Sequence, residues 1–310
     1  MNLTTQIKRA PWAALMLFGT TFGALAAQNY IVVDNQTGQI LGGKDQNAKV
    51  QVASLTKLAT AMVVFDWAQL TKASLNQTAT VSAQSLAAGG ANPTGLMEGD
   101  TLSLRDLLYC ALIASDNVAA TTLAEYVGAK IPNTSGLDPI NNFVAHMNAL
   151  ARSLKMTRTL FLNPSGLDSN TKGALPYSSA ADLARLTRYA YNEGDLPFYV
   201  SQKSTTVHIT RGGITNAVVL KNTNELLGQD DIDGVKTGRT NKAGDCLILS
   251  SEKKPEAIRK DDQVSVIPKR IIIVLLGSTD RFGEGLTLCR QGWGLYDQWA
   301  AKGRKIGPTL

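Results

Sequence analysis

Histidine and cysteine are scarce in this sequence, whose 310 residues include two histidines and three cysteines. His146 and His208 are too few for a typical metal site, and the cysteine spacing matches neither a zinc site nor a disulfide-rich scaffold. The nucleophile elbow G-x-S-x-G is also absent, which argues against Ser-His-Asp hydrolysis. We therefore expect no metal and no other cofactor, so any catalysis must use other side chains.

The three cysteines still permit one disulfide and one free thiol in an oxidising compartment. Cys110 lies in the apolar, helix-periodic stretch LLYCALIA, which predicts a buried thiol. Cys246 and Cys289 are then the pair that a disulfide would join, but the sequence leaves their state open.

Aromatic residues make up only 6% of the chain, and the lysines and arginines do not cluster with them. This pattern argues against nucleic-acid binding. Residues 1–26 carry Lys8 and Arg9, then an apolar run, then Ala24-Leu25-Ala26, a pattern that predicts an export signal cleaved after Ala26. The alternative, a membrane anchor, needs roughly 20 apolar residues, and this run is interrupted. Removing the signal lowers the net charge from +6 to +4, and we expect a periplasmic or secreted protein.

The rest of the chain alternates between strand-like and helix-like segments. Residues 29–45 read as a β-hairpin, residues 54–191 are mostly helix-periodic, residues 204–279 return to strand patterns, and residues 281–301 form a last helix. Ser103 and Asn117 are expected N-caps. This order predicts an α+β fold in which both chain ends supply strands to one antiparallel sheet, flanked by helices and joined to a central helical block. We assign residues 27–300 to a single domain and residues 301–310 to a tail.

A serine three residues before a lysine occurs four times in the chain. The pairs are Ser54/Lys57, Ser169/Lys172, Ser250/Lys253 and Ser251/Lys254. The second pair lies among turn residues, and the last two fall in a polar stretch that we interpret as a solvated loop. Only Ser54 begins an apolar helical run, in which Leu58, Met62 and Phe65 are expected to be buried. At a helix N-terminus its hydroxyl and the Lys57 amine share one face.

A serine hydroxyl becomes a good nucleophile only when a base removes its proton. A lysine can be that base if burial and a second cation lower its pKa toward neutrality. On this stretch alone the simpler alternative is favoured, in which Ser54 caps the helix and Lys57 lies on the surface. Two further motifs change the balance, namely Ser115-Asp116-Asn117 between two helices and Lys236-Thr237-Gly238 in a strand. The order S-x-x-K, S-x-N, K-T-G is typical of penicillin-recognising enzymes.

With these motifs the chain resembles the D-alanyl-D-alanine carboxypeptidases of the low-molecular-mass penicillin-binding protein family, peptidase family S11. The likeness covers roughly residues 28–295 and includes FVAHMNALARSLKMTRTLFLNPSGLD, YSSAADLARLTRYA and LKNTNELL. It implies a β-lactamase/transpeptidase-like fold. It also implies peptidoglycan stem peptides as substrates and β-lactams as covalent inhibitors.

The resemblance implies a role for each motif residue. Ser54 would form the acyl-enzyme, with Lys57 as general base. Ser115 would relay a proton to the leaving D-alanine, Asn117 would hold Lys57 and the substrate amide, and Lys236 would keep Lys57 neutral.

The K-T-G strand would bind the substrate. Lys236 and Thr237 would bind its carboxylate, Gly238 would let it lie against the strand, and backbone N–H groups of Ser54 and Arg239 would form the oxyanion hole. Lys221 and Arg281 resemble cations of relatives and are candidate carboxylate-binding or structural residues.

The sequence also departs from the family. Many relatives carry a second, β-rich domain and an amphipathic anchor after the catalytic domain. The tail here is short and broken by Gly303 and Gly307, so we expect no stable membrane anchor after signal removal.

Three alternatives to a carboxypeptidase remain. A D,D-endopeptidase that cleaves peptidoglycan cross-bridges would use the same site. A class A-like β-lactamase would need a glutamate where the stretch TLFLN has Thr159, which argues against it. A non-catalytic wall-binding protein would not need all the motif residues.

Overall fold

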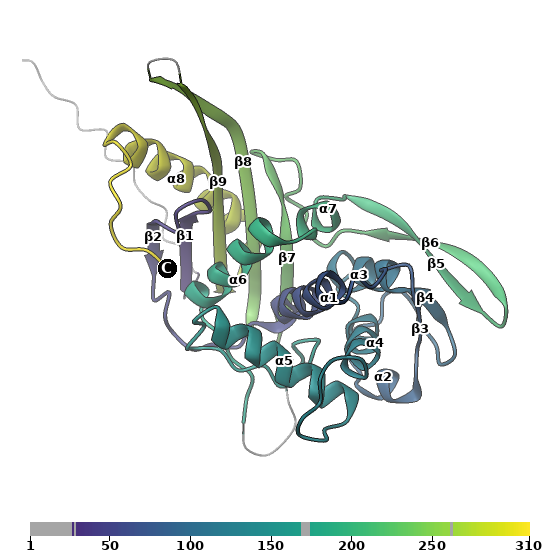
Figure 1. Ribbon diagram of the computed structural model, residues 1–310. Helices are drawn as coiled ribbons and strands as arrows, with labels where there is room; N and C mark the ends of the chain where they lie inside the picture. The colour runs from purple at the N-terminus through teal and green to yellow at the C-terminus, as the bar shows by residue number, and fades with distance from the viewer. Residues whose placement is uncertain (1–26, 28, 169–173, 261–262) are drawn as a thin grey trace, which may run out of the picture.

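Two antiparallel sheets with helices around them form the computed structural model, which describes residues 27, 29–168, 174–260 and 263–310 (Figure 1). The predicted export signal (1–26) and the Ser169/Lys172 pair lie outside the described residues. Within these ranges, no helix has the length and apolarity needed to cross a membrane.

The larger sheet takes strands from both ends of the chain, as predicted, in the order β2-β1-β9-β8-β7. Its strands are β1 (Asn29–Asp34), β2 (Ile40–Lys44), β7 (Ile232–Thr240), β8 (Gly244–Lys260) and β9 (Gln263–Ser278). The central strand β9 is apolar on both faces, because alternate side chains point to opposite sides. Ile271, Ile273 and Leu275 join one core under α8 (Arg281–Ala301), and Ile272 and Val274 join the other.

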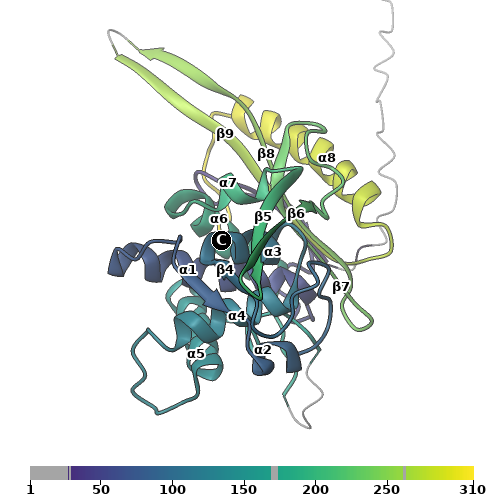
Figure 2. The ribbon, with the colours of Figure 1, turned by 90° about the vertical axis from the view of Figure 1, so that its right-hand side faces the viewer.

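Strand β8 corrects one expectation. Ser250 and Ser251 were predicted to lie in a solvated loop, but both are fully buried inside β8, opposite Ile272 and Ile271 of β9. The prediction was wrong because the charged residues that follow do not end the strand. They continue it into a long hairpin with β9 that projects beyond the sheet (Figures 1 and 2).

A second, four-stranded sheet has the order β3-β4-β5-β6. Its strands are β3 (Thr78–Thr80), β4 (Thr101–Ser103), β5 (Ser204–Arg211) and β6 (Ile214–Lys221). The hairpin of β5 and β6 was predicted as strands, and it does not join the larger sheet. It pairs instead with short strands from the helical half of the chain, through Thr101 and Thr210, a long-range pairing that no local pattern reveals.

The central block is helical, as predicted. It contains α1 (Lys57–Thr71), α2 (Ala83–Ala87), α3 (Leu104–Leu112), α4 (Asn117–Gly128), α5 (Pro139–Ser153), α6 (Ala180–Glu193) and α7 (Leu196–Val200). Ser103 is confirmed as the N-cap of α3, since its Oγ accepts from the Asp106 N–H at 3.0 Å. The N-cap of α4 is Asp116 and not Asn117, because the Asp116 carboxylate accepts from the Ala119 N–H at 2.9 Å.

All three cysteines are free and buried. The prediction of a buried thiol at Cys110 is therefore confirmed, and the possible disulfide between Cys246 and Cys289 does not form. Cys246 lies in β8 and belongs to the core on the helical-block side of the sheet, whereas Cys289 of α8 belongs to the core on the other side.

The segment after α8 returns to the turn between β1 and β2. Ile40 N donates to Pro308 O at 2.9 Å, and Leu310 N donates to Gly38 O at 3.1 Å.

Candidate active site

Ser54 lies in a short 3₁₀ turn, Ala53–Thr56, that leads directly into α1. Neither turn nor helix has a side-chain cap, so the interpretation of Ser54 as an N-cap is wrong. Ala53 has a φ of 49°, a left-handed conformation that is unfavourable for alanine. This turn presents the Ser54 side chain to an open cavity while the following helix is buried.

Lys57 is buried at the first position of α1, with 0% of its surface exposed, so it is not a surface lysine. Its Nζ donates to Ser54 Oγ at 2.8 Å, to Asn117 Oδ1 at 2.6 Å and to the Ser165 carbonyl at 2.9 Å. Burial lowers the pKa of Lys57 from 10.5 to about 7, and the Asp116 carboxylate opposes that shift. Lys57 is therefore a base held within hydrogen-bond distance of a serine hydroxyl.

Ser115 and Lys236 form the second hydroxyl–amine contact. Lys236 Nζ donates to Ser115 Oγ at 2.8 Å and to the Thr237 carbonyl at 3.0 Å. Burial lowers the pKa of Lys236 well below 10.5, and the charges of Lys57 and Arg281 lower it further. Ser115 has a φ of 63°, so this serine too is presented by a strained turn.

Strand β7 passes close to the 3₁₀ turn at Gly238. A Cβ there would lie 3.0 Å from Ser54 N and 3.1 Å from the Val52 carbonyl, so any side chain at this position would push the Ser54 turn away by a few tenths of an ångström. The loop that carries Gly166 approaches the 3₁₀ turn from the other side, where a Cβ on Gly166 would lie 2.0 Å from the Ala53 carbonyl oxygen and collide with it. The Ser54 backbone is thus enclosed between strand β7 and the loop that carries Gly166.

Two arginines lie at the end of β7. Arg281, the first residue of α8, donates from Nη1 to the Gly238 carbonyl at 3.2 Å and to Asp245 at 3.3 Å. Arg239 has an exposed side chain, which lies 3.6 Å from Asp245. Both line the same cavity as Ser54.

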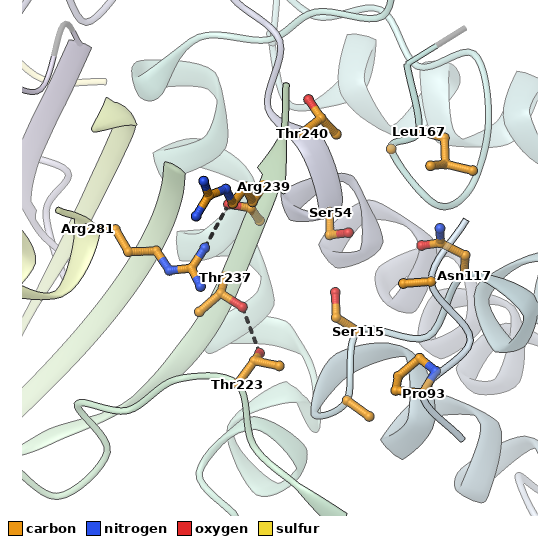
Figure 3. A pocket seen from close by; sticks show the side chains of 14 residues that line it. Ser54, Pro93, Ser115, Asn117, Leu167, Thr223, Thr237, Arg239, Thr240 and Arg281 are labelled. Atoms are coloured by element: carbon orange, nitrogen blue, oxygen red, sulfur yellow. Dashed lines mark hydrogen bonds between the residues drawn. The ribbon is translucent and has the colours of Figure 1, made fainter. Parts of the chain in front are cut away.

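The cavity has a volume of about 370 Å³ (Figure 3). Ser54 and Ser115 lie in the middle of it, between Thr237 of β7 and Asn117. Its lining consists of Ser54, Ala91, Pro93, Ala114, Ser115, Asn117, Gly166, Leu167, Thr223, Thr237, Gly238, Arg239, Thr240 and Arg281. Lys57 and Lys236 lie behind this lining, where both are almost completely buried.

The structure therefore brings together nine of the ten predicted site residues. The exception is Lys221, which is exposed at the end of β6 and does not line the cavity. Thr223, two residues further on, lines it instead, and sequence reasoning missed it. The segment LKNTNELL did point to this connection, but the resemblance to relatives drew attention to Lys221 rather than to Thr223.

Two further contributors were not predicted as site residues. Asp116 is fully buried and raises the pKa of Lys57, and Ser165 offers its carbonyl to Lys57. Among the described residues, no cluster of histidine, cysteine, aspartate or glutamate could hold a metal ion.

The geometry agrees with the comparisons with known proteins. Residues 17–260 match the model of peptidase family S11, described as D-alanyl-D-alanine carboxypeptidase. The chain belongs to this family. The chain is 32% identical over 228 residues to the D-alanyl-D-alanine endopeptidase of Pseudomonas aeruginosa, an alignment that covers 73% of this chain and 67% of that one. It is 34% identical over 270 residues to the D-alanyl-D-alanine carboxypeptidase DacD of Salmonella typhimurium, covering 84% and 60% respectively.

The fold of this S11 family member is also that of solved relatives. The Streptomyces K15 DD-transpeptidase superposes with a TM-score of 0.74 at 25% identity, covering 88% of this chain and 99% of that one. The predicted α+β, transpeptidase-like fold is therefore confirmed. The chain spans about three fifths of the length of some curated relatives.

Proposed function

We propose that this S11 protein is a serine D-alanyl-D-alanine carboxypeptidase that removes the last D-alanine from peptidoglycan stem peptides. One observation carries the proposal. The buried Lys57, with a pKa of about 7, has its Nζ 2.8 Å from Ser54 Oγ, and Ser54 lines a cavity to which residues of all three motifs contribute. A neutral amine so close to a serine hydroxyl is what an activated nucleophile requires.

In the first step, Ser54 Oγ attacks the carbonyl of the penultimate D-alanine while Lys57 accepts the hydroxyl proton. The new C–O bond gives a tetrahedral intermediate, whose oxyanion is held by backbone N–H groups of Ser54 and Arg239. The peptide C–N bond then breaks, and the proton held by Lys57 passes through Ser115 to the leaving D-alanine amine. Water hydrolyses the resulting ester and restores Ser54.

The other residues position the substrate in this scheme. Thr237, Lys236 and Arg281 bind the terminal carboxylate, and the edge of β7 accepts the peptide as an added strand. Asn117 holds the Lys57 amine through its Oδ1 and offers its side chain to the substrate amide. Lys221 is left as a surface cation.

A D,D-endopeptidase is the second candidate, because the similar Pseudomonas aeruginosa protein carries that name. Purified cell-wall material separates the two activities. A carboxypeptidase releases free D-alanine, whereas an endopeptidase converts cross-linked dimers into monomers.

A β-lactamase receives little support from the site. None of the described residues that line the cavity carries a carboxylate. Thr159 has its hydroxyl 2.8 Å from Ser178 Oγ and donates to Asp182 at 2.9 Å, and it does not line the cavity. A penicillin ester on Ser54 should therefore persist. A non-catalytic wall-binding role gives no reason to bury Lys57 beside Ser54.

A fluorescent penicillin tests the proposal. The wild-type protein should become covalently labelled, with the label on the peptide that contains Ser54, and Ser54→Ala should take none. A wild type without label, or a labelled Ser54→Ala protein, would refute the assignment of the nucleophile. The proposed substrate also places the protein outside the cytoplasm, in the periplasm or secreted.

A further inference from the structure

The hydroxyl groups of Thr223 and Thr237 are 2.6 Å apart, and both threonines line the cavity beside Ser54 (Figure 3). Thr237 belongs to β7, whereas Thr223 lies in the connection that follows β6. The contact therefore joins two segments on the substrate-facing side of the cavity.

The segment around Thr223 is held firmly. Thr223 N donates to the Ile113 carbonyl at 3.1 Å, which ties it to the turn before Ser115. Asn222 donates to the Val200 carbonyl at 3.1 Å, and Asn224 donates to the Gly234 carbonyl at 3.0 Å. With both neighbours anchored, the Thr223 hydroxyl has a defined position opposite β7.

Either hydroxyl could be the donor in this contact, and its effect on the substrate depends on which one donates. A threonine hydroxyl has one proton, so only one of the pair can donate to the other. Arg281, whose guanidinium donates to the Gly238 carbonyl, is a donor only and cannot accept the other proton. The Lys236 amine is directed instead at Ser115 Oγ and the Thr237 carbonyl. We infer that Thr223 is a positioning residue that donates to Thr237 Oγ1, which leaves the Thr237 proton directed at the substrate carboxylate.

The inference rests on the proposed function, in which Thr237 contacts that carboxylate. With the opposite donor order, Thr237 would present lone pairs to a negative group and weaken binding. Thr223 thus acts on recognition of the terminal carboxylate rather than on the Ser54–Lys57 chemistry. Its removal should change KM more than kcat.

The experiment compares wild type, Thr223→Val and Thr223→Ser on two synthetic peptides. One ends in D-alanyl-D-alanine with a free carboxylate, and the other ends in the carboxamide. For the carboxylate peptide, Thr223→Val should raise KM about tenfold, the scale of a hydrogen bond to a charged group, with kcat changed less than threefold. Thr223→Ser should restore KM to within threefold. For the carboxamide peptide the effect of Thr223→Val should shrink to less than twofold.

Thr215→Val is the matched control, because the Thr210 and Thr215 hydroxyls form a similar pair, 2.8 Å apart, on the exposed part of β5 and β6. Equal losses on both peptides, no loss with Thr223→Val, or no rescue by serine would overturn the inference. If Thr223→Val unfolds, Thr223→Ala on the same two peptides decides.

Labelling by penicillin, which also has a carboxylate, separates this inference from the proposed function. If wild type is labelled but releases no D-alanine, the carboxypeptidase proposal fails. The inference then stands only if Thr223→Val slows labelling about tenfold. If wild type is not labelled and cleaves neither peptide, both fail.

Discussion

Replacing Asp116 with asparagine should lower the pH at which Lys57 loses its proton and Ser54 becomes reactive. Asp116 is fully buried next to Asn117, and burial raises the pKa of its own carboxyl group. In its ionised form this carboxylate raises the pKa of Lys57 against the lowering caused by burial. Asparagine keeps a side-chain oxygen to cap α4 at Ala119 but removes the charge. The Lys57 pKa in the variant should therefore lie below the wild-type value of about 7.

The magnitude follows from the fraction of neutral amine. At pH 7, a lysine with a pKa of 10.5 is neutral in about one molecule in 3,000, whereas a pKa of about 7 makes about half of the molecules neutral. The net lowering of the Lys57 pKa thus makes its neutral form more than a thousandfold more abundant at pH 7. Loss of one nearby carboxylate lowers a lysine pKa by about one unit. At pH 6 the variant should then contain about fivefold more neutral Lys57 than wild type.

The assay is the second-order rate constant of acylation by a fluorescent penicillin between pH 5 and 9. The acid limb should move down by about one pH unit in Asp116→Asn. The plateau above pH 8 should be somewhat lower, because a weaker base removes the serine proton less well. Asp138→Asn is a matched control, since Asp138 also caps a helix, α5, but is exposed.

Two results would refute this reasoning. An acid limb that stays in place, or moves upward, in Asp116→Asn would show that this carboxylate does not act on Lys57. A Lys57→Ala protein with near-normal acylation would remove Lys57 as the base, since loss of a general base should cost at least 100-fold. Because the Asp116 carboxylate also accepts from Thr94 N at 3.1 Å, the fold of the variant is checked by circular dichroism.

Further predictions concern packing and stability. Gly238→Ala places a Cβ 3.0 Å from Ser54 N and should slow acylation at least tenfold by shifting Ser54. The control Gly294→Ala, with nothing within 4 Å of its Cβ, should be acylated at the wild-type rate. Equal acylation rates for the two variants would contradict the argument. Lys57→Met should remove a pH dependence of stability. Burial lowers the Lys57 pKa from 10.5 to about 7 in the folded protein, so between these pH values Lys57 is protonated in the unfolded chain and mostly neutral in the folded one. The free energy of unfolding of the wild type therefore rises with pH in this range. In urea unfolding, the stability of Lys57→Met relative to wild type should therefore fall by about 2 kcal/mol between pH 7 and 9, and an unchanged difference would exclude a lowered Lys57 pKa.

The three motifs could be predicted from the sequence because each depends on local pattern and order. Ser54 begins an apolar helical run, and Lys236-Thr237-Gly238 falls in a β-branched stretch, so element type selected residues that the structure brings together. Element type also excluded Ser250 and Ser251 as members of a catalytic serine–lysine pair, but on the wrong prediction that they lie in a loop. Charged residues after them looked like a loop, but pairing with the apolar run of β9 keeps that segment in a strand.

The remaining parts of the site depend on contacts between distant segments. The low pKa of Lys57 requires burial by a loop whose Ser165 carbonyl lies 108 residues away in the sequence. Thr223 lines the cavity, and its asparagine neighbours anchor it to Val200 of α7 and Gly234 of β7. Neither effect leaves a periodic signal in the chain, and both follow from tertiary packing.

The backbone and the charges of the site point to one physical origin for its reactivity. Ala53 and Ser115 have left-handed backbone conformations, each of which costs about 1–3 kcal/mol. Lys57 and Lys236 are buried amines, and their lowered pKa values show that their charged forms are disfavoured. These costs fall on residues of the motifs or beside them, whereas helix α1 and strand β9 supply apolar burial. A solvated Lys57 would stay protonated at neutral pH. The features that destabilise this region are therefore the ones on which the proposed reactivity of Ser54 depends.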